Sequence, residues 1–156
     1  STSWFAVKSN GKTSGFTIVF GGPDFEPEEF LKTSRLKPNV IHRGDALRSG
    51  EIADESWIEF ADVRVGTYPL DVAAEAIDFI DSHREEFRHL TCFPGVVTRT
   101  LNFFGDERSC AIELEPAQIA LVHELSLHVS ICPYFQSTKN VGLTQRPQSV
   151  TPPEPR

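Results

Sequence analysis

The sequence predicts an α+β fold, in which an antiparallel or mixed twisted sheet of about five strands carries about three helices, mainly on one face. Segments with an apolar side chain at every second position alternate with segments whose apolar side chains recur every three to four residues. The chain has 156 residues, of which 39% are hydrophobic and 24% charged, as is typical of one globular domain.

Two strands are expected at the N-terminal end. Residues 4–8 are mostly apolar and could form a short first strand. A second strand places Phe16, Ile18 and Phe20 on one face, and the glycines and proline of 21–23 end it.

A helix is expected over 27–34, because Pro27 suits the first helical position and Pro38 limits the helix on its far side. Residues 39–56 show no periodicity and predict a long loop. Strand-like spacing returns over 57–65.

The clearest element is a long helix from about 69 to 90. One half of its helical wheel is apolar: Ala73, Ala76, Ile77, Phe79, Ile80 and Phe87. The opposite half is acidic: Asp71, Glu75, Asp78, Asp81 and Glu85.

Two strands, 96–104 and 109–114, are expected to pair as an antiparallel hairpin around the turn residues 105–108.

A third helix follows over 115–125, with Ile119 and Val122 expected to point inward. The last strand, 127–132, is expected to turn His128 to solvent, opposite an apolar stripe.

The domain is expected to span 1–135, followed by an extended or disordered, proline-rich tail over 136–156. The net charge is −7, and because the tail carries +2, the body carries −9. Such a body repels nucleic acid and anionic lipid and attracts basic partners.

Three cysteines at unrelated spacings predict no disulfide framework and favour a reducing compartment. No segment reaches the roughly 18 apolar residues of a membrane span, and no signal pattern is present, so a cytoplasmic location is expected.

A set of loose motifs follows in order along the chain. Gly21 to Glu29 reads Gly-Gly-Pro-Asp-Phe-Glu-Pro-Glu-Glu, Leu36-Lys37-Pro38 and Arg43-Gly44-Asp45 come next, and the last strand ends near Cys-Pro-Tyr. Over about residues 14–135 this pattern resembles a family of small bacterial proteins catalogued only as a domain of unknown function (the four-thousand-two-hundred-seventies series). The resemblance implies an α+β domain in a bacterial cytosol and no established activity. Small proteins of this style are often encoded beside polymorphic toxins, where they act as immunity proteins.

No motif predicts a catalytic, metal or cofactor site. His123 and His128 are five residues apart across a helix-to-strand transition, so they do not share the helix face that a zincin-type site requires. The glycines of 21–23 lack the Lys and Ser/Thr of a phosphate-binding loop and are followed by carboxylates that repel phosphate.

Two surfaces remain as candidate sites. The acidic half of the long helix is either a solvated face or a docking surface for a basic protein. The loop with Arg43 and Asp45, near Trp57, is either a simple turn or a ligand-contacting site.

The lead hypothesis is therefore a non-enzymatic protein-binding module, an immunity-type inhibitor that neutralises a basic toxin. The alternative is a small enzyme or ligand-binding domain with a pocket at the 39–56 loop, so the sequence leaves enzymatic activity open. A third reading is a structural subunit whose C-terminal tail pairs with another copy, and the sequence does not give the oligomeric state.

Overall fold

The computed structural model describes residues 13–65, 69–105 and 112–132. The elements in chain order are β1 (Thr13–Gly22), α2 (Pro27–Leu31), β2 (Asn39–Ile41), β3 (Ser56–Val65), α3 (Pro69–Ser82), α4 (Arg84–Thr91), β4 (Thr98–Gly105), α5 (Pro116–Glu124) and β5 (His128–Cys132). The strand predicted at 4–8 and the tail predicted at 136–156 lie outside the described residues.

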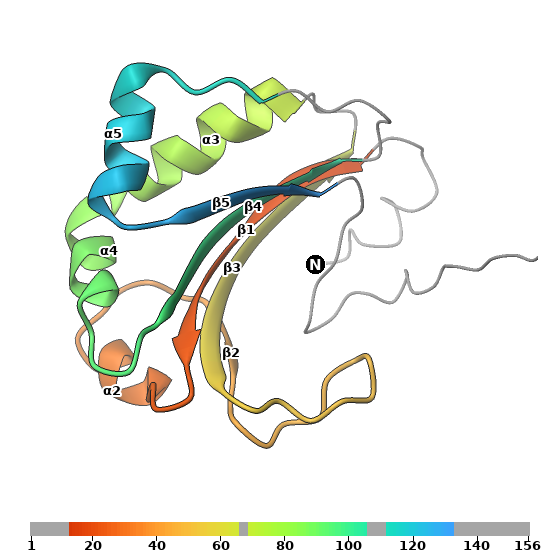
Figure 1. Ribbon diagram of the computed structural model, residues 1–156, viewed down its shortest axis with the longest axis vertical. Helices are drawn as coiled ribbons and strands as arrows, with labels where there is room; N and C mark the ends of the chain where they lie inside the picture. Colours follow the sequence, from red (N-terminus) through yellow and green to blue (C-terminus); the bar gives the residue numbers. More distant parts are fainter. Residues whose placement is uncertain (1–12, 66–68, 106–111, 133–156) are drawn as a thin grey trace, which may run out of the picture.

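The five strands form one mixed sheet in the order β2-β3-β1-β4-β5. All neighbours are antiparallel except β4 and β5, which are parallel. The sheet is strongly curved, and the four described helices cover one side of it (Figure 1). The predicted α+β class and the mixed sheet are therefore confirmed.

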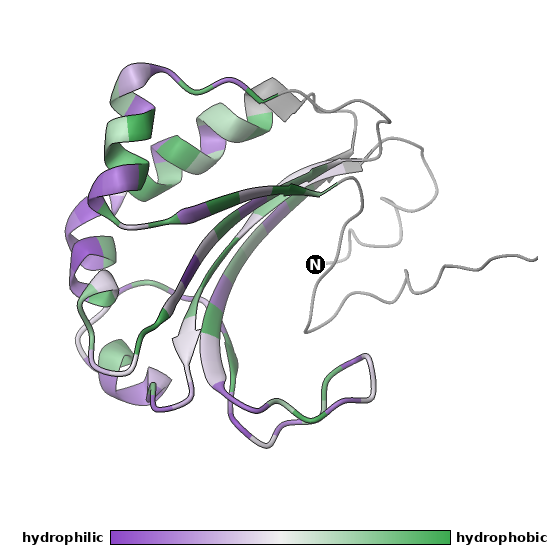
Figure 2. Cartoon of the chain, viewed as in Figure 1, coloured by the Kyte–Doolittle hydropathy of each residue, from purple (hydrophilic) through white to green (hydrophobic). Residues whose placement is uncertain are grey.

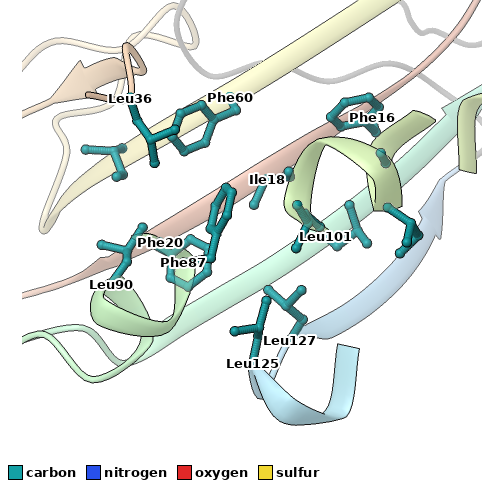
Figure 3. Close-up of a cluster of buried hydrophobic side chains, with 14 of the residues drawn as sticks. Phe16, Ile18, Phe20, Leu36, Phe60, Phe87, Leu90, Leu101, Leu125 and Leu127 are labelled. Atoms are coloured by element: carbon teal, nitrogen blue, oxygen red, sulfur yellow. The ribbon is translucent and has the colours of Figure 1, made fainter. Parts of the chain in front are cut away.

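The central strand β1 is placed by its alternating pattern. Phe16, Ile18 and Phe20 are all buried on the face that the helices cover, as the spacing predicts. β3 and β4 flank β1 in register, so that Ile18 lies between Phe60 and Leu101. Figure 3 shows these side chains in one cluster with Leu125 and Leu127, which close the core from the α5 side.

α4 contributes the centre of an aromatic cluster. The Phe87 ring lies 5.8 Å from that of Phe20, 5.6 Å from that of Phe60 and 5.8 Å from that of Phe79, measured between centroids. Phe87 is fully buried. Because these four rings come from two strands and two helices, the cluster joins the helix layer to the sheet.

The predicted long helix is two helices. α3 ends at Ser82 and α4 begins at Arg84, because His83 leaves helical geometry with φ −120° and ψ 34°. The ring Nδ1 of His83 lies 3.0 Å from the Phe79 carbonyl oxygen. Ala73, Ala76, Ile77, Ile80 and Phe87 are buried as predicted, whereas Phe79 is half-buried.

The predicted hairpin is wrong in its described part. Residues 112–114 form no strand, and β4 pairs with β1 and β5 instead. The half-buried Ile112 and Leu114 pack against the core as a connection that leads into α5. This β4-α5-β5 crossover makes the last strand parallel to β4, which a two-residue turn cannot do.

Two smaller expectations are also corrected. The region 39–56 contains the short strand β2, which pairs with β3 from Asn39 opposite Glu59 to Ile41 opposite Trp57. Ile119 does not point inward: its side chain is 53% exposed, whereas Val122 packs against the core. Within the described part of the chain, no helix is both long and apolar enough to cross a membrane.

Candidate functional site

The acidic residues of the long-helix region lie at different depths. Asp78 and Asp81 on α3 and Glu85 on α4 are exposed, and they are called the acidic helix surface below. Glu75 is half-buried and already has an interaction partner within the protein. The side chain of Asp71 lies outside the described part of the structure.

Two arginines partly neutralise the acidic helix surface. Arg84 bonds Asp81 at 2.8 Å and reaches Glu124 of α5 at 3.3 Å. Arg88 bonds both Glu85 and Glu124. The hydrogen bond with Glu124 raises the pKa of Arg88 above its ordinary value. Arg84 therefore links α3 and α4 to α5, and Arg88 links α4 to α5.

The acidic character survives this pairing. Residues 69–91 carry six carboxylates against two arginines, which leaves a net charge of −4. Asp78 is exposed, and no described cation bonds it. A basic protein that approaches this side of the molecule therefore meets a negative field.

Glu86, the sixth carboxylate, has a structural role. Its Oε2 accepts hydrogen bonds from the Ser34 hydroxyl at 3.1 Å and from the Arg35 backbone N–H at 2.8 Å. It thus anchors the segment after α2 to α4. No local spacing signals this contact, because 51 residues separate Glu86 from Arg35.

The loop around Arg43 and Asp45, one of the two candidate sites, is a hydrogen-bonded turn. Asp45 Oδ2 accepts the His42 backbone N–H at 2.8 Å, and Gly44, with φ +97°, donates its N–H to the Ala53 carbonyl at 2.8 Å. This is the turn chemistry that Gly and Asp favour.

Trp57 is buried, whereas Arg43 and Asp45 are exposed. It is only 9% exposed and packs with Ile41 and Ala53 in a second, smaller apolar cluster on the sheet face opposite the helices. Among the described contacts, none joins the three predicted side chains. The loop therefore exposes the Arg43 guanidinium and the Asp45 carboxylate, whereas the Trp57 indole is buried in the smaller apolar cluster.

His42 is the residue of this loop that sequence reasoning missed. Its Nε2 lies 2.5 Å from Glu28 Oε2, and its Nδ1 lies 3.8 Å from Asp45 Oδ2. The hydrogen bond with His42 holds the pKa of Glu28 below its ordinary value of 4.5. The imidazole thus links α2 to the loop between two exposed carboxylates.

A groove of about 520 Å³ lies between β3, α3 and the segment after α2. Its apolar lining comes from Phe16, Leu36, Phe60 and Phe79. Its polar lining comes from Arg35, Lys37, Asn39, Glu59, Asp62 and His83. It lies at the N-terminal border of the predicted 39–56 loop site, but Arg43, Asp45, Trp57 and His128 do not line it.

The histidines and cysteines converge on no metal site within the described ranges. His123 and His128 are both exposed, as the spacing argument predicts for His128. Cys92 is exposed and Cys132 half-buried, and Cys110 lies outside the described residues.

No protein family, no curated protein and no solved structure matches the chain. The family resemblance therefore stays a prediction, and the functional argument rests on the geometry above.

Proposed function

We propose that the chain is a protein-binding module of the bacterial cytoplasm, an immunity-type inhibitor that neutralises a basic toxin by direct binding. The acidic helix surface is the docking site. Asp78 and Asp81 make first contact, and the arginine-paired Glu85 extends the surface onto α4.

One observation carries this proposal: three carboxylates, Asp78, Asp81 and Glu85, are exposed on α3 and α4, within a segment (residues 69–91) whose net charge is −4. Arg84 and Arg88 hold Asp81, Glu85 and Glu124 in fixed positions. A preformed array of carboxylates steers a cationic partner and raises the association rate by about 10- to 1,000-fold. A nuclease-type toxin is basic because its substrate is anionic, so it suits this surface.

The test begins with a pull-down by the full chain from the native host, followed by purification of the captured proteins. Association rates are then measured at about 50 and 300 mM NaCl, on either side of physiological screening. The double variant Asp78→Lys, Asp81→Lys should slow association about tenfold at the lower salt. In the wild type, the rate should fall as salt rises.

The matched control is Glu51→Lys, Asp54→Lys, which changes the net charge equally at two exposed positions of the β2–β3 loop. It should slow association far less. Equal effects of the two double variants would mean that bulk charge, and not this surface, drives binding. A captured partner that is acidic would rule the proposal out.

A second candidate function rests on the groove. Three aromatic rings and the cationic side chains of Arg35 and Lys37 line it, and its volume is within the usual range of ligand pockets. Glu59 and Asp62 add two carboxylates to the lining, so an anionic ligand would have to lie against the exposed Arg35 and Lys37. The lining then suits a small carboxylate with an aromatic or aliphatic body.

The groove is tested by NMR titration with benzoate and with the uncharged benzamide. Benzoate should shift the amides of residues 35–39 and 59–62, and Arg35→Ala, Lys37→Ala should abolish those shifts. The Arg35 bond to Glu86 uses backbone nitrogen, so this variant keeps it. If benzamide causes equal shifts, Arg35 and Lys37 do not distinguish a charged ligand from an uncharged one.

A further inference from the structure

The last strand of the sheet has one unoccupied side among the described residues. β5 pairs with β4 alone, from His128 opposite Thr100 to Cys132 opposite Phe104, and it is the outermost strand (Figure 1). Its five residues extend for roughly 17 Å. Natural edges are usually protected by Lys, Pro or a bulge, and residues 128–132 contain no Lys or Pro.

Two side chains along this edge, Val129 and Ile131, are apolar and β-branched. Ile131 is 48% exposed although it lies on the helix-covered face, paired with the buried Phe103. Val129, on the same face, is half-buried. A β-branched side chain half in solvent at a sheet edge is ready to pack against a neighbouring strand.

α5 carries a second apolar feature on the same side of the molecule. Its outward residues recur at helical spacing and form what is called the outer stripe: Pro116, Ile119, Ala120 and His123. The stripe carries no carboxylate, and its isoleucine is 53% exposed. Figure 2 shows hydrophobic residues both on α5 and along β5. α5 thus has apolar residues on two sides, of which only the inner side, with Leu121, packs into the core.

We propose that β5 and the outer stripe of α5 form a self-association interface, through which two copies of the chain join their sheets edge to edge. An antiparallel pairing centred on Ser130 places Val129 opposite Ile131 of the second copy, and the reverse. On the other face it places His128 opposite Cys132. A two-fold axis perpendicular to the sheet relates the copies, so both helix layers lie on one side of a continuous sheet.

A second copy fits this edge because the strand is complementary to itself. The pairing opposes two β-branched apolar pairs on the helix face and no carboxylate with another carboxylate. Of the nearby acids on α5, Glu124 is already paired with Arg84 and Arg88. The rest of the molecule, at −7, repels its copy, so this uncharged region is where two copies approach most easily.

The interface is small, one short strand and one helix stripe, so the dimer is weak. We expect a micromolar Kd, as for small transient interfaces. Salt should strengthen the dimer, because it screens the repulsion between two chains of −7. Binding of a basic partner has the opposite salt dependence, so failure of either proposal is distinguishable from failure of the other.

The test is sedimentation velocity of the full chain from about 2 to 200 µM, which spans a micromolar Kd. Wild type should shift from monomer to dimer, and amides of residues 128–132 should gain protection from hydrogen exchange as concentration rises. Ile131→Lys and Ile119→Lys, both at exposed positions, should raise the dimer Kd at least tenfold while the thermal midpoint of unfolding stays unchanged.

Ile52→Lys is the matched control, because it makes the same substitution at a 62% exposed isoleucine of the β2–β3 loop. It should dimerise like wild type. A wild type that stays monomeric over the whole range would overturn the proposal, even if an extended peptide of another protein bound the edge. Equal loss of dimer in Ile52→Lys and Ile131→Lys would also overturn it.

Discussion

Gly95, in the connection from α4 to β4, takes a φ of +88°. A methyl group there would lie 2.6 Å from the Asp24 carbonyl group and 2.7 Å from Phe25 Cα. Both neighbours are backbone atoms, which cannot move aside as a flexible side chain can. The position thus needs glycine for its conformation and for its space.

We predict that Gly95→Ala lowers the free energy of unfolding by about 2–4 kcal/mol, adding overpacking to the strain of a left-handed residue. Gly50→Ala is the control, since Gly50 has φ +94° but nothing within 4 Å of the added carbon. It should cost only about 1 kcal/mol. Urea unfolding of both variants checks the difference, and equal losses would show that the backbone at Gly95 relaxes freely.

Glu28 makes stability depend on pH. Its pKa is lowered in the folded state by His42, so its ionised form is the one that folding favours. The resulting stabilisation is present above the ordinary value of 4.5 and is lost as the pH falls through the lower, folded pKa. The contribution is small because the pair is exposed.

Glu28→Gln should therefore lose less stability than wild type when the pH is lowered from about 6 to about 3, because it has no carboxylate at this position to protonate. Urea midpoints at both pH values measure the difference. Glu26→Gln, an exposed neighbour outside the His42 contact, should keep the wild-type pH dependence. A wild-type slope in Glu28→Gln would show that the contact does not persist in solution.

Among the elements, α4 packs into the core through two fully buried side chains, Phe87 and Leu90, and Phe87 supplies its ring contacts with the sheet. This ring contacts Phe20, Phe60 and Phe79 and is fully buried, so its removal leaves a cavity at the junction of both layers. Phe87→Ala should cost about 3–5 kcal/mol in urea unfolding. Val97→Ala, at a 64% exposed position, should stay within about 0.5 kcal/mol of wild type. Similar losses would mean that α4 is held by other contacts.

Element type was predictable wherever a pattern was long enough. The alternation of Phe16, Ile18 and Phe20 predicts β1 and its buried face correctly. A strand of three residues is too short to show an alternating pattern, so the sequence does not predict β2. The hairpin was wrong because alternation predicts a strand and says nothing of its partner, and the crossover through α5 decides that partner. The break at His83 carries no glycine or proline signal.

The candidate site was predictable only in its local part. The helical wheel places Asp78, Asp81 and Glu85 on the outside. Arg84 follows Asp81 by three residues and Arg88 follows Glu85 by three, a spacing at which side chains on a helix can pair. Glu124 is 40 residues from Arg84 and 36 from Arg88, so its part in the network needs the fold. The groove likewise joins four segments that no motif connects: Phe16, residues 35–39, residues 59–62, and Phe79 with His83.

At the scale of the whole molecule, charge and apolar surface are separated. The carboxylates of residues 69–91 lie on α3 and α4, whereas the outer stripe of α5 and the edge of β5 carry none. One molecule can therefore offer an acidic surface to a basic partner and an uncharged edge to its own copy. Salt should weaken the binding of a basic partner, because it screens an attraction. It should strengthen the association of two copies, because it screens a repulsion.

The domain boundary predicted near residue 135 is tested by removing residues 136–156. Every described helix, strand and core residue lies between 13 and 132, and the removed segment has no hydrophobic periodicity. The shortened chain should keep its cooperative transition, with a midpoint within about 3 °C of the full chain, a shift equivalent to less than 1 kcal/mol. Its net charge changes from −7 to −9, so its thermal midpoint should rise more steeply with salt. Loss of the cooperative transition would show that residues beyond 135 are needed for folding. The domain would then include the proline-rich segment.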